Sequence, residues 1–288
     1  MSQEPESEGD SLEESLAKTL LVFSNPDKLR HRTSGLGEFM PDWPFRLLLA
    51  GPPGVGKRNL ALNLAFRLEP PPSAIHIAHY DPHTREYDEL ETLGAPIYFY
   101  GPEDLPTIEN IAAPDPPPVG DSDMQAETSQ ADPSVSATPE ELAEAEEEAE
   151  AKATLSSALG ESPLVIFDEI TKDILPAAQA SRLERLLNYG STHKNTSVIT
   201  SIQDITNIPP KSRRAFDHFA LWKQPDDGGV TLAANRVGVP PDLLRELFGL
   251  CYDKHDSIWV DTHRSPEDPY RFRLNWLTPI RATEKIDF

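Results

Sequence analysis

The stretch GPPGVGK at Gly51 to Lys57 decides the fold, because of what lies on each side of it. It follows the apolar run RLLLA at 46–50 and precedes NLALNLAFRL at 59–68, in which apolar residues recur at helical spacing. A glycine-rich loop between a strand and a helix offers backbone N–H groups and a helix N-terminus to a phosphate. The pattern therefore predicts an ATP-binding loop that consists of Gly51, Pro52, Pro53, Gly54, Val55, Gly56, Lys57, Arg58 and Asn59.

Inside this loop, Lys57 is expected to reach the β- and γ-phosphate oxygens, but the residue after it departs from the usual pattern. The pattern G-x-x-x-x-G-K-[ST] places a hydroxyl there to ligate Mg²⁺, whereas Arg58 offers donors and no lone pair. Two interpretations stay open. Either water fills the metal position beside Arg58 and hydrolysis is retained, or the site binds nucleotide and turns it over slowly. We favour retained hydrolysis.

A second half-site follows the apolar run LVIF at 164–167, which is typical of a buried strand. Asp168 at the end of this run is expected to hold Mg²⁺ beside the phosphate loop. Glu169 would then polarise the water that attacks the γ-phosphate. An acidic pair after a strand is common on its own, so its weight comes from the loop at Gly51 to Lys57.

Two further groups follow along the chain. The apolar run SVITSI at 197–202 ends in Gln203, whose amide can both donate and accept hydrogen bonds near the γ-phosphate and the water. Arg213 and Arg214 come next, in PPKSRRAF. They are candidates for arginine fingers that act on the nucleotide of a neighbouring subunit, and a solvated basic turn is the alternative.

Strand-like and helix-like segments alternate along the ordered part of the chain. The segments 45–50, 74–80, 95–101, 164–167, 197–202 and 219–223 are predicted strands, with closing strands at 257–261 and 270–276. Helices are predicted at 59–68, 174–190 and 242–251. This alternation predicts an α/β fold with a mainly parallel sheet that helices cover on both faces.

Composition divides the chain into three expected regions. Residues 1–43 form an acidic, partly disordered N-terminal arm, 44–108 and 162–288 a single ATPase domain, and 109–161 an acidic Pro/Ala/Glu-rich disordered insertion. The net charge of −22 argues at first against a nucleic-acid partner, but sixteen acidic residues and a single basic one, Lys152, lie between Gly101 and Glu161. The part from Ser162 onward is nearly neutral, which leaves room for local basic patches.

Other residues give weaker expectations. A single cysteine, an acidic N-terminus without an apolar leader and the lack of a long apolar run predict a soluble, intracellular protein without membrane insertion. In HIAHYDPH at 76–83, the spacing of His76 and His79 puts them on opposite faces of a strand, which disfavours a metal site. The C-terminal arginines alternate with acidic residues, so a mixed charged surface is expected rather than a DNA groove: Arg264, Arg271, Arg273 and Arg281.

Taken together, GPPGVGKRNLALNL at 51–64, LVIFDE at 164–169 and the long segment from NYGSTHKN to ALWK at 188–223 resemble the viral DNA-packaging ATPases of the FtsK/HerA superfamily. The segment 251–279 is similar to the ends of the poxvirus-type and adenovirus-type packaging proteins. The resemblance covers about 45–101 and 162–280. It implies a RecA-like P-loop core in a homo-oligomeric ring that drives double-stranded DNA into a preformed capsid, with ATP and Mg²⁺ as cofactors.

The same resemblance implies roles for single residues and for partners. Lys57 becomes the phosphate lysine, Asp168 the metal carboxylate, Glu169 the catalytic base and Gln203 the sensor. Capsid or portal and vertex proteins become partners, in the nucleus or cytoplasm of a host cell or at the packaging vertex of a virion. Arg58 departs from the family pattern, and Ser191-Thr192 replaces an arginine often found before the histidine.

The main hypothesis is therefore an ATP-driven motor that translocates DNA. The alternative is an ATP-binding assembly or scaffold factor in which Arg58 makes hydrolysis slow. Phosphotransfer to a small molecule is disfavoured, because no arginine-rich lid follows Asp168 in the sequence.

Overall fold

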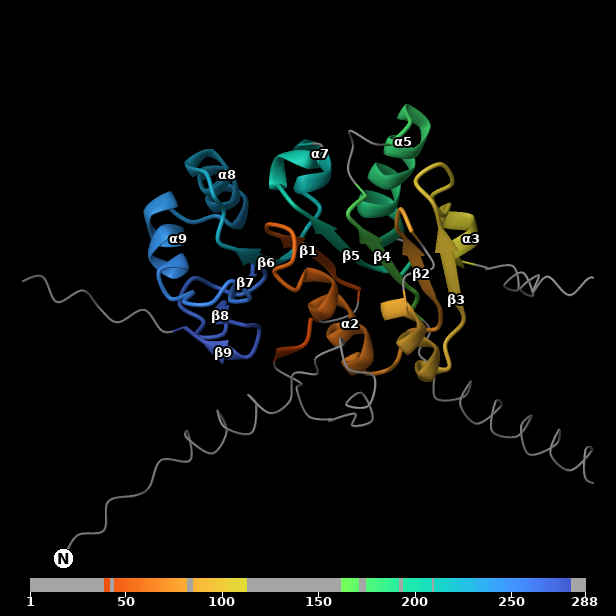
Figure 1. Cartoon of the computed structure of the whole chain (residues 1–288), viewed down its shortest axis with the longest axis horizontal. Helices are drawn as coiled ribbons and strands as arrows, with labels where there is room; N and C mark the ends of the chain where they lie inside the picture. The colour runs from red at the N-terminus through yellow and green to blue at the C-terminus, as the bar shows by residue number, and fades with distance from the viewer. Residues whose placement is uncertain are drawn as a thin grey trace, which may run out of the picture.

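The computed structural model describes residues 39–41, 44–81, 85–112, 162–170, 175–191, 194–208 and 210–280. These residues form a nine-stranded sheet with the strand order β3-β2-β4-β5-β1-β6-β7-β8-β9 (Figure 1). The strands from β3 to β6 in this order are parallel, and β7, β8 and β9 extend the sheet as antiparallel strands. The predicted α/β fold with a mainly parallel sheet is confirmed.

The strands are β1 (Arg46–Ala50), β2 (Ile75–Ala78), β3 (Ile97–Tyr100), β4 (Leu164–Asp168), β5 (Ser197–Ile202), β6 (His218–Trp222), β7 (Ser257–Asp261), β8 (Phe272–Leu274) and β9 (Thr278–Pro279). The α-helices are α2 (Lys57–Arg67), α3 (Ile108–Ala112), α5 (Ala177–Arg185), α7 (Pro210–Arg213), α8 (Asp227–Val237) and α9 (Pro241–Phe248). Shorter helical segments are η3 (Arg85–Leu93), η4 (Leu186–Gly190) and η5 (Ile205–Asn207).

Helices cover both faces of the sheet, as the sequence predicts. Successive side chains of a strand point to opposite faces, so each strand contributes to two cores. In β1, Leu47 and Leu49 belong to the core that contains residues of α2 and η3. Leu48 and Ala50 belong to the core that contains residues of α3, α5, α8 and α9. The parallel strands are therefore buried on both sides, which explains their nearly continuous apolar sequences.

The strand order brings three chain segments to one edge of the sheet. β5 lies between β4 and β1, and these strands are parallel, so their carboxyl ends meet. Ala50 at the end of β1 pairs with Ile202, and Asp168 at the end of β4 pairs with Ser201. The glycine-rich loop, Glu169 and Gln203 therefore leave neighbouring strands at the same edge, where ligands of open parallel sheets bind.

The connection between β2 and β3 is polar in sequence but packs on the sheet. It contains the 3₁₀ helix η3, in which Tyr87, Leu90 and Leu93 are buried. These three residues are spaced by three, which matches the three residues per turn of a 3₁₀ helix. The segment therefore packs against the sheet, and this places Tyr87 next to the end of β4.

Helix α8 has no counterpart among the predicted elements. Gly228 and Gly229 lower its helix propensity, which hid the helix in the sequence. Its start is fixed by Asp226, whose Oδ1 accepts a hydrogen bond from the Gly229 N–H at 2.7 Å. Its buried side has the helical spacing of Val230, Ala233, Ala234 and Val237.

Three element boundaries also differ from the prediction. The helix predicted at 174–190 is α5 followed by the π-helical segment η4, which ends at Gly190. The closing strand predicted at 270–276 is reduced to β8. Helix α3 occupies the first residues of the predicted acidic insertion, because Ile108 and Ile111 are buried in the hydrophobic core. The rest of that insertion and almost all of the N-terminal arm lie outside the described residues.

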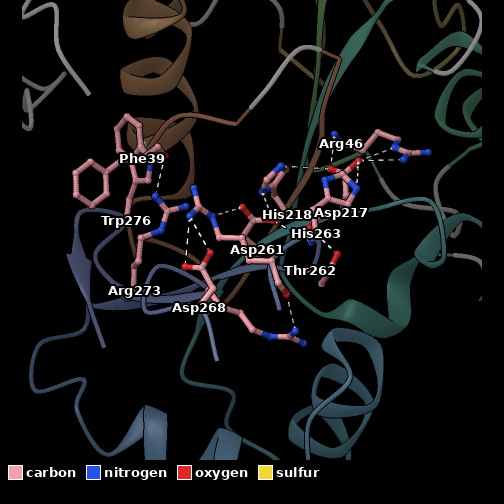
Figure 2. A network of polar contacts seen from close by, with 12 residues as sticks. Phe39, Arg46, Asp217, His218, Asp261, Thr262, His263, Asp268, Arg273 and Trp276 are labelled. Carbon is pink, nitrogen blue, oxygen red and sulfur yellow. Dashed lines mark hydrogen bonds and ion pairs between the residues drawn. The ribbon is translucent and has the colours of Figure 1, made fainter. Parts of the chain in front are cut away.

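Two of the four C-terminal arginines correct the expectation of a mixed charged surface, whereas Arg264 is partly exposed and Arg281 lies outside the described residues. Arg271 and Arg273 are buried, with 8% and 1% of their surface exposed, so they form neither a charged surface nor a DNA groove. Arg273 donates from Nη1 to the Phe39 carbonyl at 2.8 Å (Figure 2). Its guanidinium lies over the rings of Phe39 and Trp259. Burial lowers the pKa of Arg273 to about 9. These contacts fasten Phe39 to the antiparallel strands.

A substitution at Gly51 tests how tightly the loop fits on the sheet. A Cβ added to Gly51 would lie 2.5 Å from Cβ of Trp222, which is buried in β6. Gly51→Ala is therefore expected to lower the free energy of unfolding by about 1–3 kcal/mol through overpacking, measured by urea denaturation. Gly101→Ala is the control, because a Cβ there meets nothing within 4 Å, and it should be neutral or stabilise by up to about 1 kcal/mol. Equal stability of the two variants would contradict the prediction.

Candidate nucleotide-binding site

The glycine-rich loop adopts a backbone conformation that favours glycine at two positions. Gly54 and Gly56 have φ values of +71° and +99°, in the left-handed region. The chain then enters α2 at Lys57, whose side chain is only 5% exposed. Its Nζ donates to the carbonyls of Gly51 and Pro52 at 2.8 and 2.9 Å, so the ammonium lies inside the curl of its own loop. That is the position from which it can exchange carbonyl oxygens for phosphate oxygens.

The pKa of Lys57 reflects this enclosed position. Burial lowers it below the usual value for lysine, and the charges of Glu169 and Asp168 oppose the shift only in part. A buried ammonium gains more from a phosphate than an exposed one does, because the surrounding dielectric is low. The loop is therefore electrostatically prepared for an anion.

Glu169 and Gln203, predicted as base and sensor, are brought together at the mouth of the loop. Nε2 of Gln203 donates to Oε2 of Glu169 at 3.1 Å, and Oε1 of Glu169 lies 3.6 Å from Nζ of Lys57. The Glu169 N–H donates to the Ser201 carbonyl at 2.9 Å. This bond holds Glu169 at a backbone φ of +57°. Residues other than glycine rarely adopt this conformation, and those that do are often found at functional sites.

Asp168, predicted to hold a metal ion, is occupied by donors of the chain itself. Its carboxylate is 4% exposed, and its Oδ2 accepts hydrogen bonds from Nε of Arg58 at 2.6 Å and from the Tyr87 hydroxyl at 2.7 Å. Burial alone would raise the pKa of Asp168, but the charge of Arg58 and the hydrogen bonds from Tyr87 and Arg58 outweigh it and lower the pKa. The carboxylate is thus ionised at neutral pH.

Arg58, which replaces the usual hydroxyl residue, is held on several sides. Besides Asp168, its guanidinium contacts Oε2 of Glu86 at 3.4 Å and Nε2 of His79 at 2.9 Å. It also lies 5.4 Å from the centre of the Tyr87 ring, within range of a cation–π interaction. Burial raises the pKa of the Tyr87 hydroxyl, and the negative charge of Asp168 raises it further, so this group stays a donor. Arg58 therefore puts a fixed positive charge beside Asp168.

This arrangement does not fit a magnesium ion as the side chains lie. Mg²⁺ requires oxygen ligands in near-octahedral geometry, and here a guanidinium stands 2.6 Å from the carboxylate that would coordinate it. A metal ion could use Asp168 only after Arg58 had released it. The magnesium role of Asp168 stays a prediction.

The other predicted site residues lie as follows. Nε of Arg213 donates to the Ile208 carbonyl at 2.8 Å within its own turn, and Arg214 is exposed. Both arginines contribute positive charge near Arg236, whose pKa is lowered first by burial and then by these two charges. Asn59 lies in the first turn of α2. An arginine-finger role toward a neighbouring subunit stays a prediction.

Sequence reasoning missed four residues of this site. Glu86 and Tyr87 of η3 contact Arg58, and the spacing by three of the buried residues in η3 was the one signal that could have located that segment. His79, which follows β2, also contacts Arg58, but its sequence position suggested only a metal ligand. His255 supports the loop from the C-terminal part of the chain, with Nδ1 3.1 Å from the Val55 carbonyl. Nothing in the local sequence indicates that contact. His76, by contrast, is fully buried beside Tyr98 and Tyr100, away from His79, as its strand position predicts.

Among the described residues, no helix is long and apolar enough to cross a bilayer. No family model and no curated protein matches the chain. Several solved structures are similar to it. One is the genome packaging NTPase B204 from Sulfolobus turreted icosahedral virus 2 in complex with AMPPCP, at 11% identity and a TM-score of 0.45 over 83% of this chain and 100% of that one.

Two other similar structures come from cellular organisms. ATPases 2 and 3 of EssC from Geobacillus thermodenitrificans are 12% identical, with a TM-score of 0.42 over 78% of this chain and 41% of that one. The ORC1 protein of Aeropyrum pernix in complex with DNA is 15% identical, with a TM-score of 0.30 over 76% and 52%. At these values the similarities add nothing to the assignment of function. The sheet order, the glycine-rich loop around Lys57 and the groups at the ends of β4 and β5 give the chain the fold of a P-loop NTPase.

Proposed function

We propose that this protein is an ATP-hydrolysing motor that moves double-stranded DNA into a viral capsid. The observation that supports it best is the position of Glu169, between the phosphate-loop lysine and Gln203. A carboxylate placed beside the lysine that would hold the γ-phosphate, and hydrogen-bonded to an amide, is arranged to act on a water molecule there. A site that only binds nucleotide has no need of this pair.

In the proposed reaction, the chain supplies positioning and charge. The loop N–H groups and Nζ of Lys57 bind the β- and γ-phosphates in place of the Gly51 and Pro52 carbonyls. Glu169 accepts the proton of the attacking water, and Gln203 orients that water through its amide. Magnesium would add further neutralisation of the phosphate charge only if Arg58 released Asp168. Arg58 provides a fixed positive charge at the same edge of the sheet.

The packaging role is supported by the resemblance of 51–64, 164–169 and 188–223 to the FtsK/HerA-type packaging ATPases. A motor of this kind would work as a homo-oligomeric ring on double-stranded DNA, with capsid or portal proteins as further partners. Arg214, which is exposed after α7, is the better placed of the two candidate fingers to reach a neighbouring subunit. The place of action would be the packaging vertex of a virion in an infected cell.

One observation favours a second candidate, an ATP-binding assembly factor with slow hydrolysis. Arg58 and Tyr87 together occupy Oδ2 of Asp168, the carboxylate expected to serve the metal ion. If this contact persists with nucleotide bound, turnover suffers while binding remains. The two candidates therefore differ in turnover and in its response to DNA.

Steady-state ATP hydrolysis with and without double-stranded DNA tests the proposal. A motor should hydrolyse ATP, and DNA should raise its turnover by about tenfold, a change of about 1.4 kcal/mol in the activation barrier. Single-stranded DNA of equal phosphate concentration is the control for a purely electrostatic effect, because the two differ mainly in charge density and groove structure. Nucleotide binding without turnover at every DNA concentration would instead establish the assembly factor.

A further inference from the structure

A second group of polar side chains lies at the opposite end of the sheet from the phosphate loop. His218 is the first residue of β6 and pairs across the antiparallel ladder with Asp261, the last residue of β7. His263 follows two residues later, and its N–H donates to Oδ1 of Asp261 at 3.0 Å. Figure 2 shows these three side chains in one network of polar contacts with Asp217 and Arg46.

The geometry of the three side chains suits a metal ion. One ligand atom from each of His218, Asp261 and His263 can be chosen so that all lie within 4.8 Å of one another, and Nδ1 of His218 is 3.7 Å from Oδ1 of Asp261. Tetrahedral ligands about 2.0–2.1 Å from a zinc ion are about 3.4 Å apart. The required closure is small. It falls mainly on His263, whose side chain is 66% exposed.

His218 gives an independent sign of a missing partner. Its side chain is 5% exposed, and Nδ1, the nitrogen that faces Asp261, is buried without a hydrogen-bond partner. A buried polar nitrogen without a partner is costly, so native proteins rarely leave one. A neutral imidazole has the lone pair that a metal ion needs.

The surroundings of the group resemble the supporting shell of a metal site. Oδ1 of Asp217 lies 3.8 Å from Nε2 of His218, on the other side of the ring from Asp261. This distance is longer than a hydrogen bond, but the carboxylate lies on the side that it takes in carboxylate–histidine–metal arrangements. Arg46 fixes Asp217 with two guanidinium hydrogen bonds of 3.1 and 3.0 Å and a backbone one of 2.8 Å. Arg264 holds Oδ2 of Asp261 at 3.0 Å, which leaves Oδ1 facing His218.

We propose that His218, Asp261 and His263 bind a divalent transition-metal ion of the zinc class, with water as the fourth ligand. Two imidazoles and one carboxylate favour such an ion over Mg²⁺ or Ca²⁺, which prefer oxygen ligands. The ion would join β6 of the parallel sheet to β7 and the turn after it. Through Asp217 and Arg46 the same contacts continue to β1, the strand that carries the phosphate loop. The site would be distinct from the nucleotide site.

Metal titration of the tag-free full-length protein tests this inference without reference to ATP hydrolysis. After removal of metals by a chelator, Co²⁺ should bind with the visible absorption of a tetrahedral nitrogen-ligated ion, and Zn²⁺ should displace it at one equivalent. Zn²⁺ should also raise the Tm, because it binds the folded chain. An octahedral Co²⁺ spectrum, or no saturable binding, would overturn the proposal.

Three variants identify the ligands. His263→Ala, at an exposed position that the fold does not need, should weaken Co²⁺ affinity by more than about 100-fold, because losing a ligand costs more than the 10–100-fold typical of a supporting residue. Asp217→Asn should fall in that 10–100-fold range. Asp268→Asn is the matched control: it removes a carboxylate that contacts Arg264 outside the group of three, and it should leave affinity unchanged. Equal affinity of His263→Ala and the unmodified protein would show that the three side chains form only an ion-pair network.

Discussion

Glu169→Gln is expected to lower the turnover of ATP by about 10²–10⁴-fold, the usual contribution of a general base. The change keeps the size of the side chain, and the amide oxygen can still accept the hydrogen bond that Gln203 now donates to Oε2. What it removes is the negative charge 3.6 Å from Nζ of Lys57 and the ability to take a proton from water. Nucleotide binding should persist, and removing a negative charge near the γ-phosphate should if anything tighten it.

Steady-state hydrolysis and nucleotide affinity are measured together, so that a loss of binding is not mistaken for a loss of catalysis. Asp204→Asn is the matched control, because Asp204 follows Gln203 directly and caps η5 by accepting a hydrogen bond from the Thr206 N–H. Asparagine caps equally well, so this variant loses one charge at the same edge and should keep its turnover. If Glu169→Gln turned ATP over at the unmodified rate, Glu169 would not be the base.

Arg58→Thr is expected to make nucleotide binding depend on magnesium. In the unmodified chain, the guanidinium already satisfies the Asp168 carboxylate at 2.6 Å, so chelating Mg²⁺ should change nucleotide affinity little. The variant loses that charge and the charge-assisted hydrogen bond, and it gains a hydroxyl where the usual P-loop has one. Mg²⁺ should then strengthen nucleotide binding by about 10–100-fold, since a charge-assisted hydrogen bond contributes about 1.5–3 kcal/mol.

The measurement is a nucleotide titration with Mg²⁺ and with a chelator, on both proteins. Arg58→Lys separates charge from shape, because an ammonium keeps the charge but cannot contact Asp168, Glu86 and His79 as the planar fork does. The effect of Mg²⁺ on the nucleotide affinity of Arg58→Lys should lie between its effects on the unmodified protein and on Arg58→Thr. A strong magnesium requirement already present in the unmodified chain would show that Arg58 leaves Asp168 when nucleotide binds.

Much of the fold could be predicted because its signals are local. The parallel strands are apolar runs bounded by turn residues, and the glycine-rich loop at Gly51 to Lys57 marks the end of one of them. The alternation of strands and helices then leaves few topologies. Helix α8 was not predicted, because Gly228 and Gly229 weaken its local signal. Its stability comes from the burial of Val230 and its neighbours in the core. Tertiary packing outweighs propensity there.

The site residues divide in the same way, into those that the local sequence indicates and those that depend on tertiary packing. Lys57, Asp168, Glu169 and Gln203 could be named because each sits at the end of a recognisable strand or loop, and the sheet brings those ends together. The partners of Arg58 could not be named, because they depend on how η3 packs on the sheet. Side chains such as His79 become ligands or partners only once a connection of unknown shape has folded.

The contacts of His255 affect how the protein unfolds locally. The histidine contacts the Val55 carbonyl from a position 200 residues further along the chain, and its own carbonyl accepts a hydrogen bond from Trp222 at 3.1 Å. Trp222 in turn is the side chain against which Gly51 closes. The phosphate loop is thus shaped by the last third of the chain as much as by its own glycines. Local unfolding of the β7 to β9 extension would take the loop with it, so amide protons of both regions should belong to one cooperative unit of hydrogen exchange.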